Sequence, residues 1–254
     1  QMLKLDSYAN IFYLDDIKIN KDTVFIMGSG YSINDISDEE WRRIRDTGDI
    51  LAFNLFYKGK FIPIDYHIVR EMGRNRFSTV LLNGKTFKSY CDEMFRNPYY
   101  KETKYFILYD KKAPATVLSV FFMKLFKNKY ICFYKNLKNR ALILEPSEDI
   151  NTIPHCGATL FDAINISYLL GYKNIVLVGV DLYDRRYFWL RKNETREGDL
   201  KRGASCNDIH NTANFVLEAM PIWKEYLQKR GVKLYVYNPR SLLNKILPIY
   251  KLDL

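Results

Sequence analysis

Short, continuously apolar segments recur along the chain, each ended by turn residues and separated from the next by a more polar stretch. Strands covered on both faces have this pattern, because neither side of such a strand meets water. The segments expected to be strands are Thr23–Met27, Ile50–Phe56, Tyr66–Val69, Tyr105–Tyr109, Ala141–Leu144, Asn174–Val180 and Val232–Tyr237. A chain of 254 residues is long enough to build one large domain around such a sheet.

Helices are expected between these apolar segments. Ser37 begins a capping-box pattern that predicts a helix over Asp38–Asp46. Further helices are expected over Thr159–Leu170 and over Asn211–Lys229, the last one kinked or split at Pro221. Strands that alternate with helices predict an α/β fold, here a single Rossmann-like domain with a mostly parallel, doubly wound sheet.

Two regions interrupt this alternation. Outside its expected strand, the stretch 72–140 is polar, basic and aromatic, and it is expected to form a helical or irregular insertion region beside the sheet. Residues 184–209 are highly charged and have no periodicity, and a loop of that length inside a domain usually has a function. We therefore predict one domain over 1–254, with an insertion region at 72–140 and a lid at 184–209.

The composition limits the possible binding partners of the protein and its cellular compartment. A formal net charge of +10 favours anionic partners, which include nucleic acid, an anionic membrane face and an acidic sugar nucleotide. No recognition helix or aromatic nucleic-acid motif is present, so we do not expect nucleic acid. The four cysteines form no CxxC pair, which favours a reducing, cytoplasmic compartment. We recognise no signal peptide and no apolar run long enough to span a bilayer.

The first candidate binding feature is a glycine-rich turn after the first long strand. Gly28, Ser29, Gly30 and Ser32 lie between this strand and a helix, where backbone N–H groups can face an anion. The pattern is neither the dinucleotide fingerprint nor a Walker A loop. A plain strand-to-helix turn is the alternative.

Polar residues follow the next apolar strands. Asn54 and Arg70 stand at or just after the carboxyl ends of two strands, the edge where open α/β sheets bind ligands. An arginine there can pair with a phosphate or a carboxylate. His155 and Thr159 precede and open a later helix, and this position is a second candidate anion site. Solvated strand ends and turns are the alternative for these residues.

The remaining candidates flank the charged segment. Asp181 and Tyr183 follow the strand that ends at Val180, and Tyr187 comes four residues after Tyr183. Asp181, like Ser32, is a candidate nucleotide-binding residue. The tyrosine hydroxyls can stabilise a departing phosphate, or the rings can simply pack beneath the lid. His210 precedes a helix and is a candidate general base, with a surface histidine that caps the helix as the alternative. A metal shared with Cys206 is disfavoured because no second ligand pair is present.

Taken in order, these features resemble the bacterial sialyltransferases of glycosyltransferase family 42. The resemblance rests on Gly28-Ser-Gly-Tyr-Ser32, Asn54 in Phe-Asn-Leu-Phe-Tyr, the strand leading to Asp181-Leu-Tyr183, His210-Asn-Thr, and Asn238-Pro-Arg-Ser-Leu-Leu243. It covers most of the chain and implies a GT-A-like variant of the sialyltransferase type. It also implies a CMP-sialic acid donor, inversion at the anomeric carbon, and no cofactor or metal.

The resemblance also implies roles for individual residues. Gly28, Ser29, Gly30 and Asn54 would contact the nucleotide, and Thr159 would lie near its phosphate or ribose. Tyr183 would bind the leaving phosphate, with Tyr187 as a looser match, and His210 would be the base. The chain departs from the family pattern at Ser29, Tyr31 and Arg70, and His155 stands in for a family arginine. Because these departures fall near the donor sugar, CMP-Kdo or another CMP-nonulosonate is an alternative donor.

The expected acceptor is a surface glycan such as lipooligosaccharide, capsule or O-antigen. Basic and aromatic clusters at Lys124–Arg140 and Ser241–Leu254 predict peripheral contact with the anionic inner membrane, with a solvated basic face as the alternative. Assembly into a homo-oligomer is left open. The functional alternatives are a different nucleotide-binding enzyme, such as a pterin diphosphokinase-like protein, and a non-catalytic module of a larger capsule enzyme.

Overall fold

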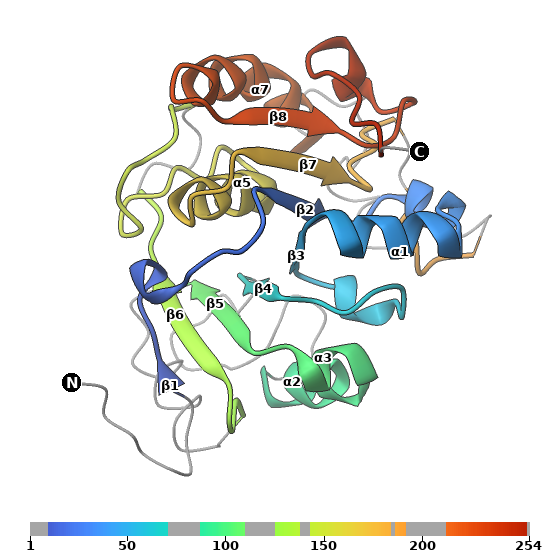
Figure 1. Cartoon of the computed structure of the whole chain (residues 1–254), viewed down its shortest axis with the longest axis vertical. Helices are drawn as coiled ribbons and strands as arrows, with labels where there is room; N and C mark the ends of the chain where they lie inside the picture. The colour runs from blue at the N-terminus through green and yellow to red at the C-terminus, as the bar shows by residue number, and fades with distance from the viewer. Residues whose placement is uncertain are drawn as a thin grey trace.

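The structure is a computed structural model of the chain. It describes residues 10–70, 87–109, 125–137, 143–183, 186–191 and 212–252. Figure 1 shows one α/β domain in which a strongly twisted sheet runs through the middle of the molecule, with helices on both sides.

The described residues form an eight-stranded sheet in the order β1-β6-β5-β4-β3-β2-β7-β8, and every neighbouring pair is parallel. The predicted mostly parallel sheet is therefore confirmed. The strands are β1 (Asn10–Ile11), β2 (Thr23–Met27), β3 (Asp49–Phe53), β4 (Tyr66–Val69), β5 (Tyr105–Tyr109), β6 (Tyr130–Tyr134), β7 (Asn174–Val178) and β8 (Lys233–Val236).

Two hydrophobic layers explain why the strands are continuously apolar. One face of the sheet packs on α5 (Thr159–Leu169) and α7 (Thr212–Gln228), and the other face packs on α1 (Asp38–Thr47), α2 (Phe87–Arg96) and α3 (Pro98–Glu102). All residues of β2 and β4 are buried as a result. Short 3-10 helices complete the described structure at Leu14–Asp16 (η1), Tyr31–Asp35 (η2), Phe56–Lys58 (η3) and Leu242–Lys245 (η4).

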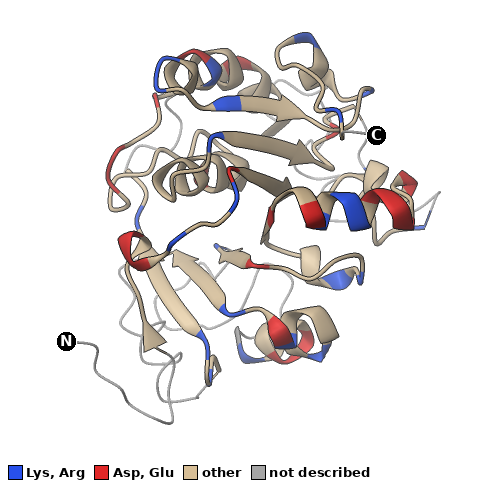
Figure 2. Ribbon diagram, viewed as in Figure 1, with Lys and Arg blue, Asp and Glu red and all other residues tan. Residues whose placement is uncertain are grey.

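Helix termini follow the sequence signals closely. Ser37 accepts a hydrogen bond from the Glu40 amide at 3.2 Å, and the Ser37 amide donates to the Glu40 carboxylate at 2.9 Å, which is the expected capping box. Figure 2 shows acidic and basic residues interspersed along this exposed helix, α1. Helix α7 runs continuously from Thr212 to Gln228 with Pro221 inside it, so the proline does not split the helix.

The stretch 72–140 differs in part from its expected irregular form. The two helices α2 and α3 agree with a helical region, but β6 was not expected and pairs with β1 and β5. Lysines flank this five-residue strand on both sides, so the sequence around it is polar and the strand was not recognised. The strand expected at Ala141–Leu144 is wrong for Ile143 and Leu144, which have no strand structure. The Leu144 carbonyl instead accepts a hydrogen bond from the Trp223 indole at 2.8 Å.

The connections indicate a candidate ligand site at the carboxyl edge of β2. From β2 the chain passes through α1 on one face to β3, whereas from β7 it passes through α7 on the other face to β8. The connections leaving β2 and β7 thus diverge at the carboxyl edge. Doubly wound sheets bind ligands at such a switch point.

A buried histidine beneath this edge gives a testable pH dependence. Burial lowers the pKa of His67 from 6.5 to about 3, and its side chain is 0% exposed. Between these two values the unfolded chain binds a proton that the folded chain does not, so stability falls as pH decreases, by up to about 1.4 kcal/mol per pH unit. Denaturant unfolding between pH 6 and pH 4 should therefore give a shallower pH dependence for His67→Gln. If the free energy of unfolding changes equally with pH in wild type and His67→Gln, the lowered pKa of His67 is contradicted.

Candidate active site

Unusual backbone conformations gather at the carboxyl edge of the sheet. Asn54 after β3, Leu182 after β7 and Cys156 before α5 have φ of 52°, 64° and 42°. They are three of the four non-glycine residues with positive φ in the described part of the chain, and the fourth, Asn128, precedes β6. Left-handed backbone at non-glycine residues costs free energy and is concentrated at functional sites. The first three positions therefore mark the same edge that the topology indicates.

The glycine-rich turn is shaped first of all by its contact with β7. A Cβ on Gly28 would lie 2.5 Å from the Gly179 carbonyl oxygen, and a Cβ on Gly30 would lie 2.4 Å from an Asp181 carboxylate oxygen. Both amides also donate to β7 or the turn after it, at 2.7 Å. Close packing between two turns thus accounts for both glycines, and a role in nucleotide contact is additional to it.

Asp181 ties the turns after β2 and β7 together. This buried carboxylate accepts hydrogen bonds from the Ser32 amide at 2.9 Å, the Ser32 hydroxyl at 2.5 Å and the Asn238 side-chain amide at 2.9 Å. Ser32 and Asp181, both predicted to bind the nucleotide, are therefore hydrogen-bonded to each other. In this arrangement they support the turn from within the fold.

The two candidate tyrosines lie on either side of this junction. Tyr183 is 38% exposed, and the Asn238 side-chain amide donates to its hydroxyl at 3.4 Å. Tyr187 forms a β-bridge with Gly30 and stacks on Trp189 with ring centroids 4.6 Å apart. The Phe188 amide donates to the Ser29 carbonyl at 3.2 Å, which holds this short segment against the glycine-rich turn.

Arg70 and His155 converge on one buried carboxylate that the sequence analysis missed. Asp162 is 0% exposed, with Arg70 Nε 2.9 Å and His155 Nδ1 3.1 Å from its oxygens. Tyr134 and Asn136 donate to the same carboxylate at 2.9 and 3.0 Å. An aspartate within the apolar helix sequence Thr-Leu-Phe-Asp-Ala-Ile was the available signal, since a charge in an apolar stripe requires a partner.

Asn54 and Thr159 connect the two halves of the edge. The Asn54 side-chain amide donates to the Thr159 hydroxyl at 3.4 Å, across the gap between β3 and the start of α5. The Asn54 side-chain oxygen is buried and has no hydrogen-bond partner. A buried carbonyl oxygen left unpaired is costly, so this atom is a natural acceptor for a ligand donor group.

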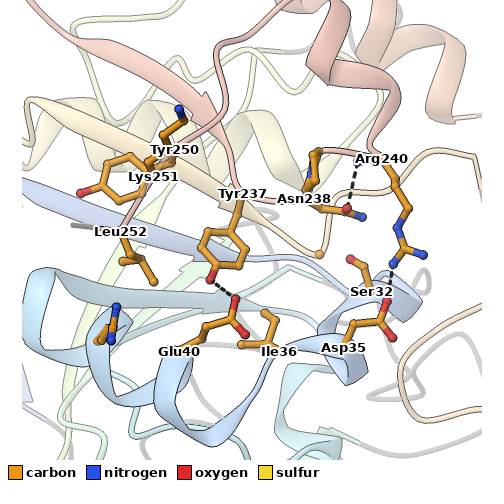
Figure 3. A pocket seen from close by; sticks show the side chains of 13 residues that line it. Ser32, Asp35, Ile36, Glu40, Tyr237, Asn238, Arg240, Tyr250, Lys251 and Leu252 are labelled. Carbon is orange, nitrogen blue, oxygen red and sulfur yellow. Dashed lines mark hydrogen bonds and ion pairs between the residues drawn. The ribbon is translucent and has the colours of Figure 1, made fainter. Parts of the chain in front are cut away.

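A cleft of about 580 Å³ lies between α1 and the end of β8. Figure 3 shows Tyr237 directed at Glu40, to which it donates a hydrogen bond at 2.7 Å, and Arg240 paired with Asp35. Burial, followed by the hydrogen bond to Glu40, raises the pKa of Tyr237 above its ordinary value. Ser32 and Asn238 also line the cleft, so it borders the Asp181 junction.

Some predicted features lie outside the described residues. His210 is one of them, as is most of the 184–209 lid, of which residues 186–191 are described. Within the described ranges, no three histidine, cysteine, aspartate or glutamate side chains gather as metal ligands. No helix in the described part of the chain has the length and apolarity needed to cross a bilayer.

The fold defines a doubly wound α/β protein, and the candidate site lies at its strand switch point. Among solved structures, the chain is similar to the crystal structure of the sialyltransferase CST-II in complex with CMP, with a TM-score of 0.51 and 18% identity. The match covers 91% of this chain and 86% of that chain. No protein-family model matches, and no match is found among curated proteins. The likeness establishes the fold, and membership of glycosyltransferase family 42 stays a prediction.

Proposed function

We propose that this protein is a CMP-sugar-dependent glycosyltransferase that moves sialic acid or a related nonulosonate to a hydroxyl of a surface glycan. The observation that carries the proposal is the fold likeness, over 91% of the chain, to a sialyltransferase solved with CMP. The residues singled out at the carboxyl edge of this sheet support the same function.

The nucleotide would lie across the ends of β2 and β3. The buried side-chain oxygen of Asn54 has no partner and suits a hydroxyl or amino donor, and CMP carries both. Thr159 opens α5, so free backbone amides of the first helical turn face the same edge.

The leaving phosphate would be stabilised by tyrosine hydroxyls and by the nearby Arg70 and His155 side chains. Tyr183 is partly exposed beside the Asp181 junction, and Tyr187 is held against Gly30. Arg70 and His155 stand at the same edge, fixed by Asp162. Hydrogen-bond donors held in place before the reaction stabilise charge as it develops, without a cost of reorganisation.

Transfer requires a base and the exclusion of water. In this proposal His210 takes the proton of the acceptor hydroxyl, and the 184–209 segment closes over the bound donor so that water does not hydrolyse it. The acceptor would be lipooligosaccharide, capsule or O-antigen, reached from the cytoplasmic side with peripheral contact to the anionic inner leaflet. The reaction would need no metal.

A thermal-shift comparison of nucleotides tests the proposal. CMP at about 100 times its Kd should stabilise the protein by about 2.7 kcal/mol, which corresponds to roughly 5–10 °C in a domain of this size. UDP, GDP, ADP and S-adenosylmethionine should give much smaller shifts. Asn54→Gly, which keeps the backbone conformation accessible but removes the amide, should reduce the CMP shift.

The donor and the metal independence are tested by turnover. CMP-sialic acid and CMP-Kdo are compared as donors with a glycan acceptor, with and without a chelator. Selective transfer from one of them, unchanged by the chelator, is the expected result. Stabilisation by another nucleotide in place of CMP would refute the proposed class.

A further inference from the structure

The loop after β3 is held in place by side chains of the helical region beneath it. The Tyr90 hydroxyl on α2 donates to the Asn54 carbonyl oxygen at 2.8 Å. Asn97, which caps α3, donates from its side-chain amide to the carbonyls of Tyr57 and Gly59 at 2.8 and 2.5 Å. Three carbonyls of one loop are thus fixed by hydrogen bonds from outside it.

Behind Tyr90 the hydrogen bonds continue into the core. His67 on β4 has its Nε2 3.2 Å from the Tyr90 hydroxyl and its Nδ1 3.1 Å from the Tyr100 hydroxyl on α3. All three side chains are buried, with exposures of 0% for His67, 3% for Tyr90 and 1% for Tyr100. A neutral histidine between two buried phenols can donate to one hydroxyl and accept from the other.

The direction of each bond follows from counting protons. The single hydroxyl proton of Tyr90 is donated to the Asn54 carbonyl, so the Tyr90 oxygen accepts from His67 Nε2–H. His67 Nδ1 then carries no proton and accepts from the Tyr100 hydroxyl. Burial lowers the pKa of His67 to about 3, which keeps the ring in the neutral form that this arrangement requires.

The chain of hydrogen bonds ends at the backbone carbonyl of Asn54. Asn54 has φ 52°, a left-handed conformation that few residues besides glycine, asparagine and aspartate adopt. Its side-chain amide reaches Thr159, while its side-chain oxygen is buried without a partner. The hydrogen bond to the Asn54 carbonyl restrains the backbone from which this side chain projects.

We propose that Tyr100, His67 and Tyr90 form a hydrogen-bond relay that positions Asn54 so that its side-chain oxygen accepts a hydrogen bond from the bound cytidine nucleotide. The inference rests on the proposed function and adds three positioning residues to it. None of the three would touch the ligand. Their effect on binding therefore passes through Asn54 alone.

The test measures the Kd of CMP by calorimetry in matched tyrosine variants. Tyr90→Phe removes the donor to the Asn54 carbonyl and should weaken CMP binding about fivefold to tenfold. The control is Tyr172→Phe, which removes an equally buried hydroxyl whose hydrogen bond, to Asp49, lies at the amino end of the sheet. The control should bind CMP as wild type does.

A double-mutant cycle separates positioning from general destabilisation. In an Asn54→Gly background, Tyr90→Phe should cause no further loss of CMP binding. In turnover, Tyr90→Phe should raise the KM for the CMP-sugar and leave kcat unchanged, because the relay touches no reacting atom. If Tyr90→Phe does not fold, Tyr100→Phe at the far end of the relay should shift the Kd in the same direction by less.

Each outcome decides the inference. Equal CMP affinities of wild type, Tyr90→Phe and Tyr172→Phe would overturn the relay while the proposed function stands. A loss that persists in the Asn54→Gly background would also overturn it, since the effect would then not pass through Asn54. Absence of CMP binding in the wild type would overturn the proposed function and the inference together.

Discussion

Replacing His210 by alanine is expected to slow sugar transfer by about 10²–10⁴-fold, while CMP binds as tightly as before. A general base acts on the acceptor hydroxyl as the new bond forms, so its removal affects the transition state and not the bound nucleotide. Both kcat and kcat/KM should fall by the same factor. The measurement pairs initial transfer rates with a calorimetric Kd for CMP.

A second variant distinguishes the base from a helix cap. His210 precedes α7, which begins at Thr212, and asparagine is a better helix cap than histidine. If the residue only caps the helix, His210→Asn should transfer sugar at the wild-type rate. If it is the base, His210→Asn should be as slow as His210→Ala, because an amide cannot take up the proton. Full activity in either variant would end the proposed role.

The pH profile gives an independent check of the same role. An unperturbed histidine has a pKa of about 6.5, and only the neutral ring can accept a proton. Wild-type kcat/KM should therefore decrease as the pH falls below this value. The residual activity of His210→Ala should lack that decrease.

The sheet could be predicted because local sequence determines it. Continuous apolar runs at Thr23–Met27, Tyr66–Val69 and Tyr105–Tyr109 coincide with β2, β4 and β5, since strands covered on both faces need no polar residues. The polar residues after such runs were also readable, which is how Asn54 and Arg70 were found. β6 was missed because it is a single short apolar run between lysines. Its pairing with β5 joins segments that are not adjacent in the sequence.

The connections within the site could not be predicted in this way. Asp162 joins Arg70 and His155, which lie 85 positions apart in the sequence, and no local pattern states that they share one carboxylate. The relay from Tyr100 to Asn54 likewise requires a strand and two helices to be in place. The hydrogen bonds between Ser32 and Asp181 also join residues far apart in the sequence, and a role of either residue in ligand binding stays a prediction.

The buried carboxylate of Asp162 gives the largest expected effect on stability. Asp162→Ala should lower the free energy of unfolding by about 3–5 kcal/mol, because removal of one partner leaves a buried charge uncompensated. The side chain of Arg70 is 14% exposed and that of His155 is 9% exposed, so water replaces little of the lost interaction. Tyr134 and Asn136 would lose their acceptor as well. Urea denaturation measures the change, and the control is Asp46→Ala on the exposed surface of α1, expected within about 0.5 kcal/mol of wild type.

A compensating substitution identifies the cause of that loss. If the unpaired cation is the main cost, Arg70→Met in the Asp162→Ala background should recover part of the stability, because the buried charge is then gone. If lost packing is the main cost, Arg70→Met should lower the free energy of unfolding further, because methionine does not fill the cavity left by the Asp162 side chain. The same pair of variants bears on the site, because Asp162 helps to hold the side chains of Arg70 and His155 at the carboxyl edge. Asp162→Ala should therefore also weaken CMP binding at a temperature where it remains folded, whereas Asp46→Ala should not.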